Sequence, residues 1–73
     1  MDPYRELACA VVMQAIDDYR TAVRNLKQNP RHTESLLMKA DCEQFFRSDW
    51  YRMFHPLDGE TVLRRVREEE LKR

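Results

Sequence analysis

The sequence has little glycine and cysteine and no surplus of charge of either sign. One Gly among 73 residues leaves no room for a glycine-rich phosphate loop, and two Cys are too few for a secreted disulfide framework. Thirteen basic residues balance thirteen acidic ones, so the basic surplus typical of nucleic-acid binding is absent. The apolar run from Ala8 to Met13 is too short to span a membrane, and no secretory signal pattern is present. We therefore expect a cytoplasmic protein.

The composition predicts one compact helical domain covering residues 1–73. Apolar residues make up 42% of the chain and charged residues 36%, which is too apolar for a disordered tail. A chain of this length forms a single small core. We predict an all-α fold, a small bundle of one long, two medium and one short helix, with no strands.

The longest predicted helix covers about residues 3–28. Asp2 can cap it, Pro3 is preset for its first turn, and Asn29-Pro30 ends it. One broad face of this helix is apolar and the opposite face is polar. Its small central residues, Ala8, Ala15 and Ala22, predict a groove into which neighbouring helices pack, with a homodimer seam as the alternative.

Three shorter helices follow, at about residues 34–47, 49–54 and 59–70. Each is preceded by a residue whose side chain can accept a bond from a free helical N–H. His55-Pro56 ends the third helix. The three predicted caps, in order, are Thr33, Ser48 and Asp58.

Large apolar side chains predict how the core is filled. Five of the seven aromatic residues lie between Phe45 and Phe54. We expect Trp50 and Phe54, which are four residues apart, to close one end of the core. The main core is expected to contain Leu37, Met38, Phe45, Val62, Leu63 and Val66, and fewer partners remain for Leu36, Phe46, Tyr51 and Met53.

The segment FFRSDWYRMF, followed by LDGETVLRRVRE, resembles a family of small, largely uncharacterised proteins of phages and other mobile elements of Firmicutes. These proteins pair an aromatic-Phe-x-Ser-acid-Trp run with a later Asp-Gly-Glu. The likeness covers roughly Cys42 to Glu68. It implies a protein of the bacterial host cytoplasm that binds another protein, in its specific form an inhibitor of a host defence nuclease such as a CRISPR effector.

The short third helix supplies the predicted protein-binding residues. Aromatic, Arg and Met side chains are favoured in protein interfaces, and a short helix ending in Pro presents them rigidly. The alternative is that Tyr51 and Met53 complete the core. The predicted interface consists of Arg47, Tyr51, Arg52, Met53 and His55.

The last helix supplies an alternative function, that of a small DNA-binding regulator. Arg64, Arg65 and Arg67 would contact nucleic acid, in a helix that follows a tight turn. Glu68, Glu69 and Glu70 would repel phosphate. Glu60, Glu68 and Glu69 lie one turn from these arginines and can pair with them. A salt-bridged solvent face is therefore the competing interpretation.

No metal, cofactor or catalytic site is predicted. The possible zinc ligands Cys9, His32, Cys42 and His55 are separated by 23, 10 and 13 residues, unlike the close pairs of zinc sites. We expect free thiols, with a Cys9–Cys42 disulfide as the alternative. Neither a Cys42–His55 pair nor Asp17-Asp18 has the further groups that catalysis requires, so we expect no enzyme.

Overall fold

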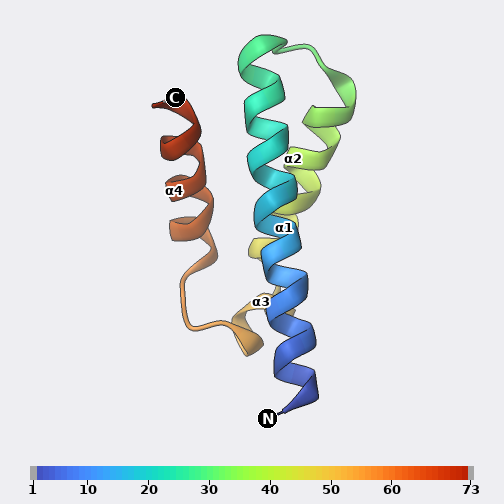
Figure 1. Cartoon of the computed structure of the whole chain (residues 1–73), viewed down its shortest axis with the longest axis vertical. Helices are drawn as coiled ribbons and strands as arrows, with labels where there is room; N and C mark the ends of the chain where they lie inside the picture. Colours follow the sequence, from blue (N-terminus) through green and yellow to red (C-terminus); the bar gives the residue numbers. More distant parts are fainter. Residues whose placement is uncertain (1, 73) are drawn as a thin grey trace.

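The computed structural model describes residues 2–72, which form four α-helices and no strand (Figure 1). They are α1 (Pro3–Gln28), α2 (Thr33–Phe46), α3 (Asp49–Phe54) and α4 (Gly59–Leu71). Each begins and ends within one residue of its predicted range. The predicted all-α bundle of one long, two medium and one short helix is confirmed.

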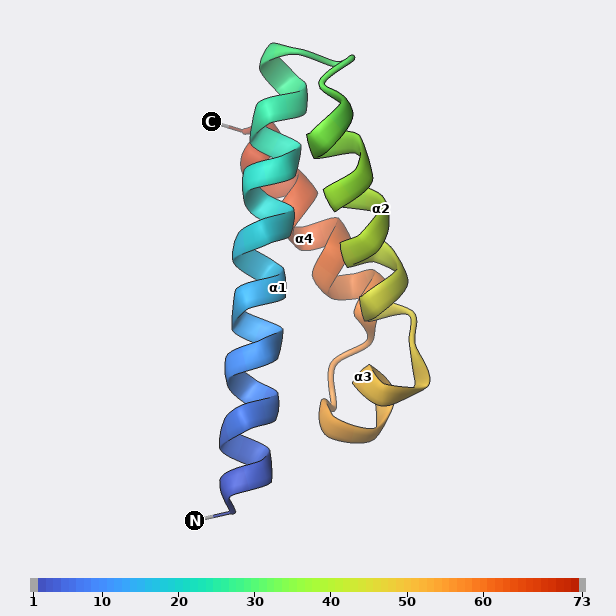
Figure 2. The ribbon, with the colours of Figure 1, turned by 90° about the vertical axis from the view of Figure 1, so that its right-hand side faces the viewer.

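The long helix α1 organises the other three. Figure 2 shows α2 and α4 packed along the C-terminal half of α1, while α3 lies below their lower ends. The N-terminal half of α1 extends past both α2 and α4, so only α3 lies near it. The molecule is elongated and measures 41 × 22 × 19 Å.

Two predicted caps are formed by the expected side chains. The carboxylate of Asp2 accepts a 3.0 Å hydrogen bond from the backbone N–H of Tyr4 at the start of α1. The hydroxyl oxygen of Ser48 accepts a 3.3 Å bond from the N–H of Tyr51 in α3. Each bond satisfies one of the amides that a helix leaves free in its first turn.

The caps of α2 and α4 differ from those predicted. His32, not Thr33, precedes α2, and its Nδ1 accepts a 3.3 Å bond from the N–H of Ser35. Asp58 precedes α4 but makes no side-chain bond to the helix backbone. Its carboxylate instead accepts a 3.3 Å bond from the Thr61 hydroxyl.

The core lies where α1, α2 and α4 meet and is closed below by α3. Ala8 and Ala22 are buried within it, so the small residues of α1 serve packing inside the bundle. The central cluster of buried apolar side chains consists of Val12, Tyr19, Val23, Cys42, Phe46, Tyr51, Leu63 and Val66. Four more apolar side chains are partly buried against this cluster: Ala15, Ile16, Phe45 and Val62.

The expected packing of α3 is wrong. Tyr51 is only 1% exposed and packs edge-on against Phe46, with ring centroids 5.0 Å apart. Trp50 is 39% exposed and lies outside this pair, in tilted contact with the exposed ring of Phe54 at a centroid distance of 4.9 Å. The six-residue helix has apolar side chains on two sides, and the Tyr51 side is the one that packs inward, against Phe45 and Phe46.

The expected orientation of α2 is also wrong in part. Leu37 and Met38 are exposed instead of covering α1, with Leu37 at 62%. The side that faces α1 carries Ser35, Cys42 and Phe46. Seen along the helix, these three residues fall on one stripe, and the small side chains of Ser35 and Cys42 let α2 approach α1 closely.

The single glycine is required by close packing and not by an unusual backbone angle. Gly59 is the first residue of α4, is buried, and does not have a positive φ. A Cβ at this position would overlap the backbone carbonyl of Phe46. Gly59 therefore lets the start of α4 rest against the end of α2.

Candidate protein-binding surface

A polar network holds α1, α2 and α4 together at the centre of the bundle. The hydroxyl of Tyr19 donates a 2.9 Å hydrogen bond to Oε2 of Glu43. It also accepts a 3.0 Å bond from Nη1 of Arg67, which lies 3.5 Å from the same carboxylate oxygen. Lys39 completes the network with a 2.9 Å bond to Glu43. One carboxylate on α2 thus joins side chains from all three helices.

The network shifts the pKa of two of its members. Burial raises the pKa of Tyr19 to about 12, although the bond from Arg67 acts in the opposite direction. Burial alone would also raise the pKa of Glu43, but hydrogen bonds from Lys39 and Tyr19 outweigh it and hold this pKa below its usual value. Tyr19 therefore stays neutral and Glu43 ionised at physiological pH.

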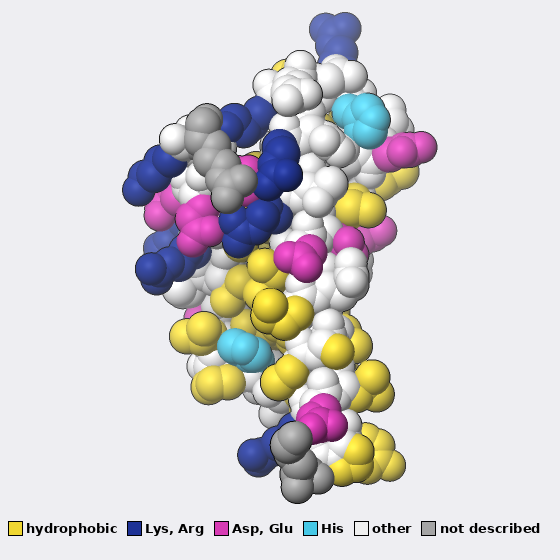
Figure 3. All heavy atoms as spheres, viewed as in Figure 1, with side chains coloured by type: hydrophobic (Ala, Val, Ile, Leu, Met, Phe, Trp, Pro, Cys, Tyr) yellow, Lys and Arg dark blue, Asp and Glu magenta, His cyan; other side chains and the backbone are white. Residues whose placement is uncertain are grey.

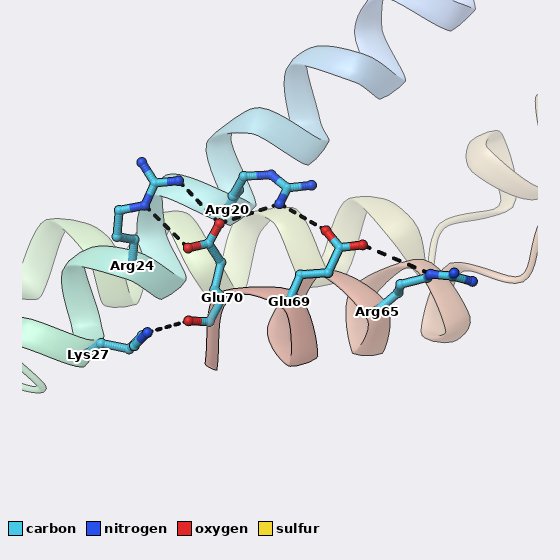
Figure 4. Close-up of polar contacts among 6 residues, drawn as sticks. All are labelled: Arg20, Arg24, Lys27, Arg65, Glu69 and Glu70. Atoms are coloured by element: carbon cyan, nitrogen blue, oxygen red, sulfur yellow. Dashed lines mark hydrogen bonds and ion pairs between the residues drawn. The ribbon is translucent and has the colours of Figure 1, made fainter. Parts of the chain in front are cut away.

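A second network fixes the end of α4 to α1, as Figure 4 shows. Glu70 is only 1% exposed, and its carboxylate accepts bonds from Nε and Nη2 of Arg24 at 3.3 and 3.2 Å. Arg20 lies 3.0 Å from Glu69 and 3.4 Å from Glu70, while Lys27 donates to the backbone carbonyl of Glu70. A buried carboxylate satisfied in this way fixes the position of α4 along α1.

These networks involve much of the charge on α4, which bears on the nucleic-acid alternative. Arg67 belongs to the central network, and Arg65 lies 4.0 Å from Glu69. Arg64 is exposed, in a shallow hollow that Arg65, Glu68 and Glu69 also line. This face carries both signs of charge, as the salt-bridged interpretation predicts.

Four of the five residues of the predicted interface line two adjoining hollows. Arg52, Met53 and His55 line one groove together. Tyr51 is buried in the core, so the expectation that it lies outside the core is wrong. Arg47 donates to Glu60 and lines a second hollow, beside the loop between α3 and α4, which Arg52 and His55 also line.

The groove that contains three of these residues lies between α1 and the end of α3. We name it the α1–α3 groove; its volume is about 430 Å³. Its apolar part comes from both sides and from the loop that follows α3, and its rim carries two arginines and an imidazole. The residues that line it are Arg5, Cys9, Arg52, Met53, Phe54, His55 and Pro56.

Exposed apolar side chains gather at the same end of the molecule as this groove. Met53 is 78% exposed, and the rings of Trp50 and Phe54 are in tilted contact. Figure 3 shows charged side chains over α4 and the C-terminal half of α1, and apolar ones toward the other end. We call the exposed apolar set the apolar end; it consists of Tyr4, Leu7, Val11, Met13, Trp50, Met53, Phe54 and Leu57.

The part of this surface that α1 contributes was not predicted from the sequence. Arg5 and Cys9 line the groove, yet neither was predicted as an interface residue. A signal was present in the run from Leu7 to Met13. Seven consecutive apolar residues cover every side of a helix, so a bundle that packs against one side leaves the others exposed.

Of the possible zinc ligands, Cys9 and His55 line the α1–α3 groove together, whereas His32 and Cys42 lie elsewhere. Both thiols are free; Cys9 is exposed, while Cys42 is buried and its pKa is raised to about 11 by burial. His32 caps α2, and His55 stacks on Tyr51. Within residues 2–72, no group of three His, Cys, Asp or Glu side chains could hold a metal ion.

Comparison with known proteins gives no relative. The chain matches no protein-family model, no curated protein and no solved structure. None of the four described helices is long and apolar enough to cross a membrane. The function is therefore inferred from the α1–α3 groove and the apolar end.

Proposed function

We propose that this protein is a non-enzymatic protein-binding module that receives a segment of another protein at the α1–α3 groove and the adjoining apolar end. The observation that supports this proposal is the concentration of exposed large apolar side chains at one end. Eight such side chains are exposed there, on α1, on α3 and in the loop after α3. Exposed apolar side chains that gather in one region commonly mark protein-binding surfaces.

The exposed side chains of α3 are held in fixed positions. Six residues are too few for a helix that is stable alone, so α3 depends on its cap by Ser48 and on the burial of Tyr51. The Trp50 ring contacts both Phe45 and Phe54 at tilted angles, with centroid distances of 5.5 and 4.9 Å. A rigid aromatic side chain loses little conformational freedom when a partner covers it, which favours binding.

The composition of the surface also supports protein binding. Aromatic residues, Met and Arg are enriched in protein interfaces, and all three types occur at Trp50, Met53 and Arg52. The groove and the apolar end together involve about half of the 20–30 residues that each partner contributes to a standard interface.

The proposed class of partner comes from the sequence resemblance to proteins of phages and mobile elements, and not from the fold. That resemblance supports a partner in a bacterial host cell, in its specific form a defence nuclease such as a CRISPR effector. Binding at the apolar end would inhibit such a partner by covering its surface, which needs no catalytic group in this chain.

A pull-down with matched variants tests the proposal. Protein retained from a bacterial host lysate by the wild-type chain would be identified by mass spectrometry and its affinity measured. The double variant Trp50→Ala with Met53→Glu should lose this protein. Leu37→Glu should keep it, because Leu37 is a similarly exposed apolar residue on α2, away from the groove.

Circular dichroism would establish that both variants are folded. If the same protein binds the Trp50 and Met53 variant as tightly as wild type, the proposed surface is wrong.

A further inference from the structure

We infer that the segment received by the α1–α3 groove is an amphipathic helix with acidic residues beside its apolar face. This inference rests on the proposed function and adds the chemistry of the partner. It follows from three properties of the groove. These are its apolar floor, its cationic rim, and side walls that offer no row of free backbone donors and acceptors.

The floor requires an apolar face on the partner. Cys9 contributes to it from α1, and Met53 and Phe54 contribute from α3. Met53 is among the most exposed apolar side chains in the chain, and Met adapts its shape to different partners. Covering this floor removes apolar surface from water, which supplies the main driving force for binding.

The rim requires negative charge on the partner. Arg5 lies on α1 and Arg52 on α3, and no carboxylate is among the residues that line the groove. Asp2 lies 4.0 Å from Arg5, and Asp49 lies 3.9 Å from Arg52, at the limit of ion pairing. All four side chains are largely exposed, so these pairs are weak and both guanidinium groups can still bind a carboxylate.

His55 adds a third donor to the rim. Its Nδ1 accepts a 3.3 Å bond from the backbone N–H of Leu57 and lies 3.2 Å from the hydroxyl of Tyr51. A neutral imidazole that accepts at Nδ1 carries its proton on Nε2. The ring therefore offers an N–H donor, which again suits an acceptor such as a carboxylate.

The walls favour a helix over an extended segment. One side of the groove is α1, whose backbone groups are bonded within the helix, and the other is the last turn of α3 with the two residues that follow it, a segment too short to pair as a strand. They offer no row of free donors and acceptors to an extended chain, which would leave its own backbone groups unsatisfied when covered. A helix satisfies its backbone internally and needs only side-chain contacts.

Two synthetic 18-residue helical peptides test the inference. Both would carry the same leucine face, with Glu on the polar face of one and Lys on that of the other. Trp50 is the only tryptophan and lies beside the groove, so its emission reports binding directly. We expect the Glu peptide to bind about tenfold more tightly at low salt, because two arginines face it, and the difference to shrink in about 0.5 M salt.

Charge reversal provides the matched comparison. Arg5→Glu with Arg52→Glu should reverse the preference between the peptides. Arg64→Glu with Arg65→Glu makes the same change in net charge on exposed positions of α4 and should leave the preference unchanged. Circular dichroism would confirm that both variants fold.

Other results of the peptide experiment would contradict the inference in different ways. Equal affinity for the two peptides would overturn the acidic character of the partner and leave the proposed function standing. If neither peptide binds at about 0.1 mM, the inferred helix is wrong, and the pull-down alone then decides the proposed function. Concentration-dependent dimers that shift Trp50 emission without peptide, or tighter binding of a 20-base-pair duplex, would assign the groove to a second copy or to nucleic acid instead.

Discussion

The hydroxyl group of Tyr19 on α1 donates a 2.9 Å hydrogen bond to Glu43 on α2, where both side chains are largely shielded from water. The bond needs the neutral hydroxyl, because a phenolate has no proton to donate and would repel the carboxylate. The fold therefore depends on the protonation of one tyrosine.

The first prediction concerns stability in alkali. The pKa of Tyr19 is about 12 in the fold and about 10 in an unfolded chain, so its contribution is fully present below pH 10 and is lost as pH rises from 10 to 12. The loss should be on the order of 2 kcal/mol. Urea unfolding at several pH values would measure it. Tyr19→Phe should show a smaller decrease over this range, and parallel curves for the two proteins would contradict the prediction.

The second prediction concerns Gly59. Alanine favours a helix over glycine by about 1 kcal/mol, so propensity alone predicts that Gly59→Ala stabilises the protein. We expect the opposite, a loss of about 1–3 kcal/mol, because the new Cβ overlaps the Phe46 carbonyl and separates α4 from α2. Thermal unfolding would decide the sign. Glu68→Ala, at an exposed position of the same helix, is the control and should change little.

The third prediction compares two neighbouring aromatic residues. Tyr51→Ala should lower the free energy of unfolding by about 3–5 kcal/mol, since it removes a fully buried ring from a small core. Trp50→Ala should cost about 1 kcal/mol, because Trp50 is partly exposed and contacts mainly Phe45 and Phe54. Denaturant titrations of both variants would rank them. A larger loss for Trp50→Ala would mean that α3 is turned the other way.

The fourth prediction concerns the two thiols. A pKa of about 11 leaves Cys42 with about a hundredfold less thiolate at pH 8 than a thiol with the ordinary value of 9, and burial slows reagent access further. A thiol reagent such as Ellman's should therefore show one fast phase, from Cys9, and one slow phase. Cys9→Ser should abolish the fast phase. A fast phase that persists in this variant would show that Cys42 is accessible.

The fifth prediction concerns the nucleic-acid alternative. Arg64, Arg65 and Arg67 lie among glutamates, and Arg67 is bound to Tyr19, so we expect no duplex binding at about 0.15 M salt. Fluorescence anisotropy with a labelled duplex would test this. Micromolar binding that Arg64→Glu weakens would instead support a DNA-binding regulator.

Sequence periodicity predicts elements that are long or that carry one apolar stripe. α1 covers seven turns, and α4 carries Val62, Leu63 and Val66 on one side, so both were oriented correctly. α2 and α3 have apolar residues on two sides, and six residues of α3 form fewer than two turns. Which side faces inward then depends on contacts with distant residues, which no local pattern contains.

The polar networks and the groove were unpredictable for a related reason. Tyr19 and Arg67 are 48 residues apart, and Arg24 and Glu70 are 46 apart, so their pairing depends on how α4 packs against α1. The groove combines Arg5 and Cys9 with residues of α3 in the same way. Three of its members, Arg52, Met53 and His55, were predicted from the sequence as interface residues, and this role remains a prediction.

The elongated shape determines how the protein can be attached to a surface or joined to a label. α1 begins at the apolar end, beside the α1–α3 groove, whereas α4 ends near the opposite end of a 41 Å molecule, as Figure 1 shows. A tether placed after α4 would hold the protein with its groove facing the solution. A fluorescent domain fused ahead of Asp2 would emerge next to Arg5 and compete with a partner for the same space.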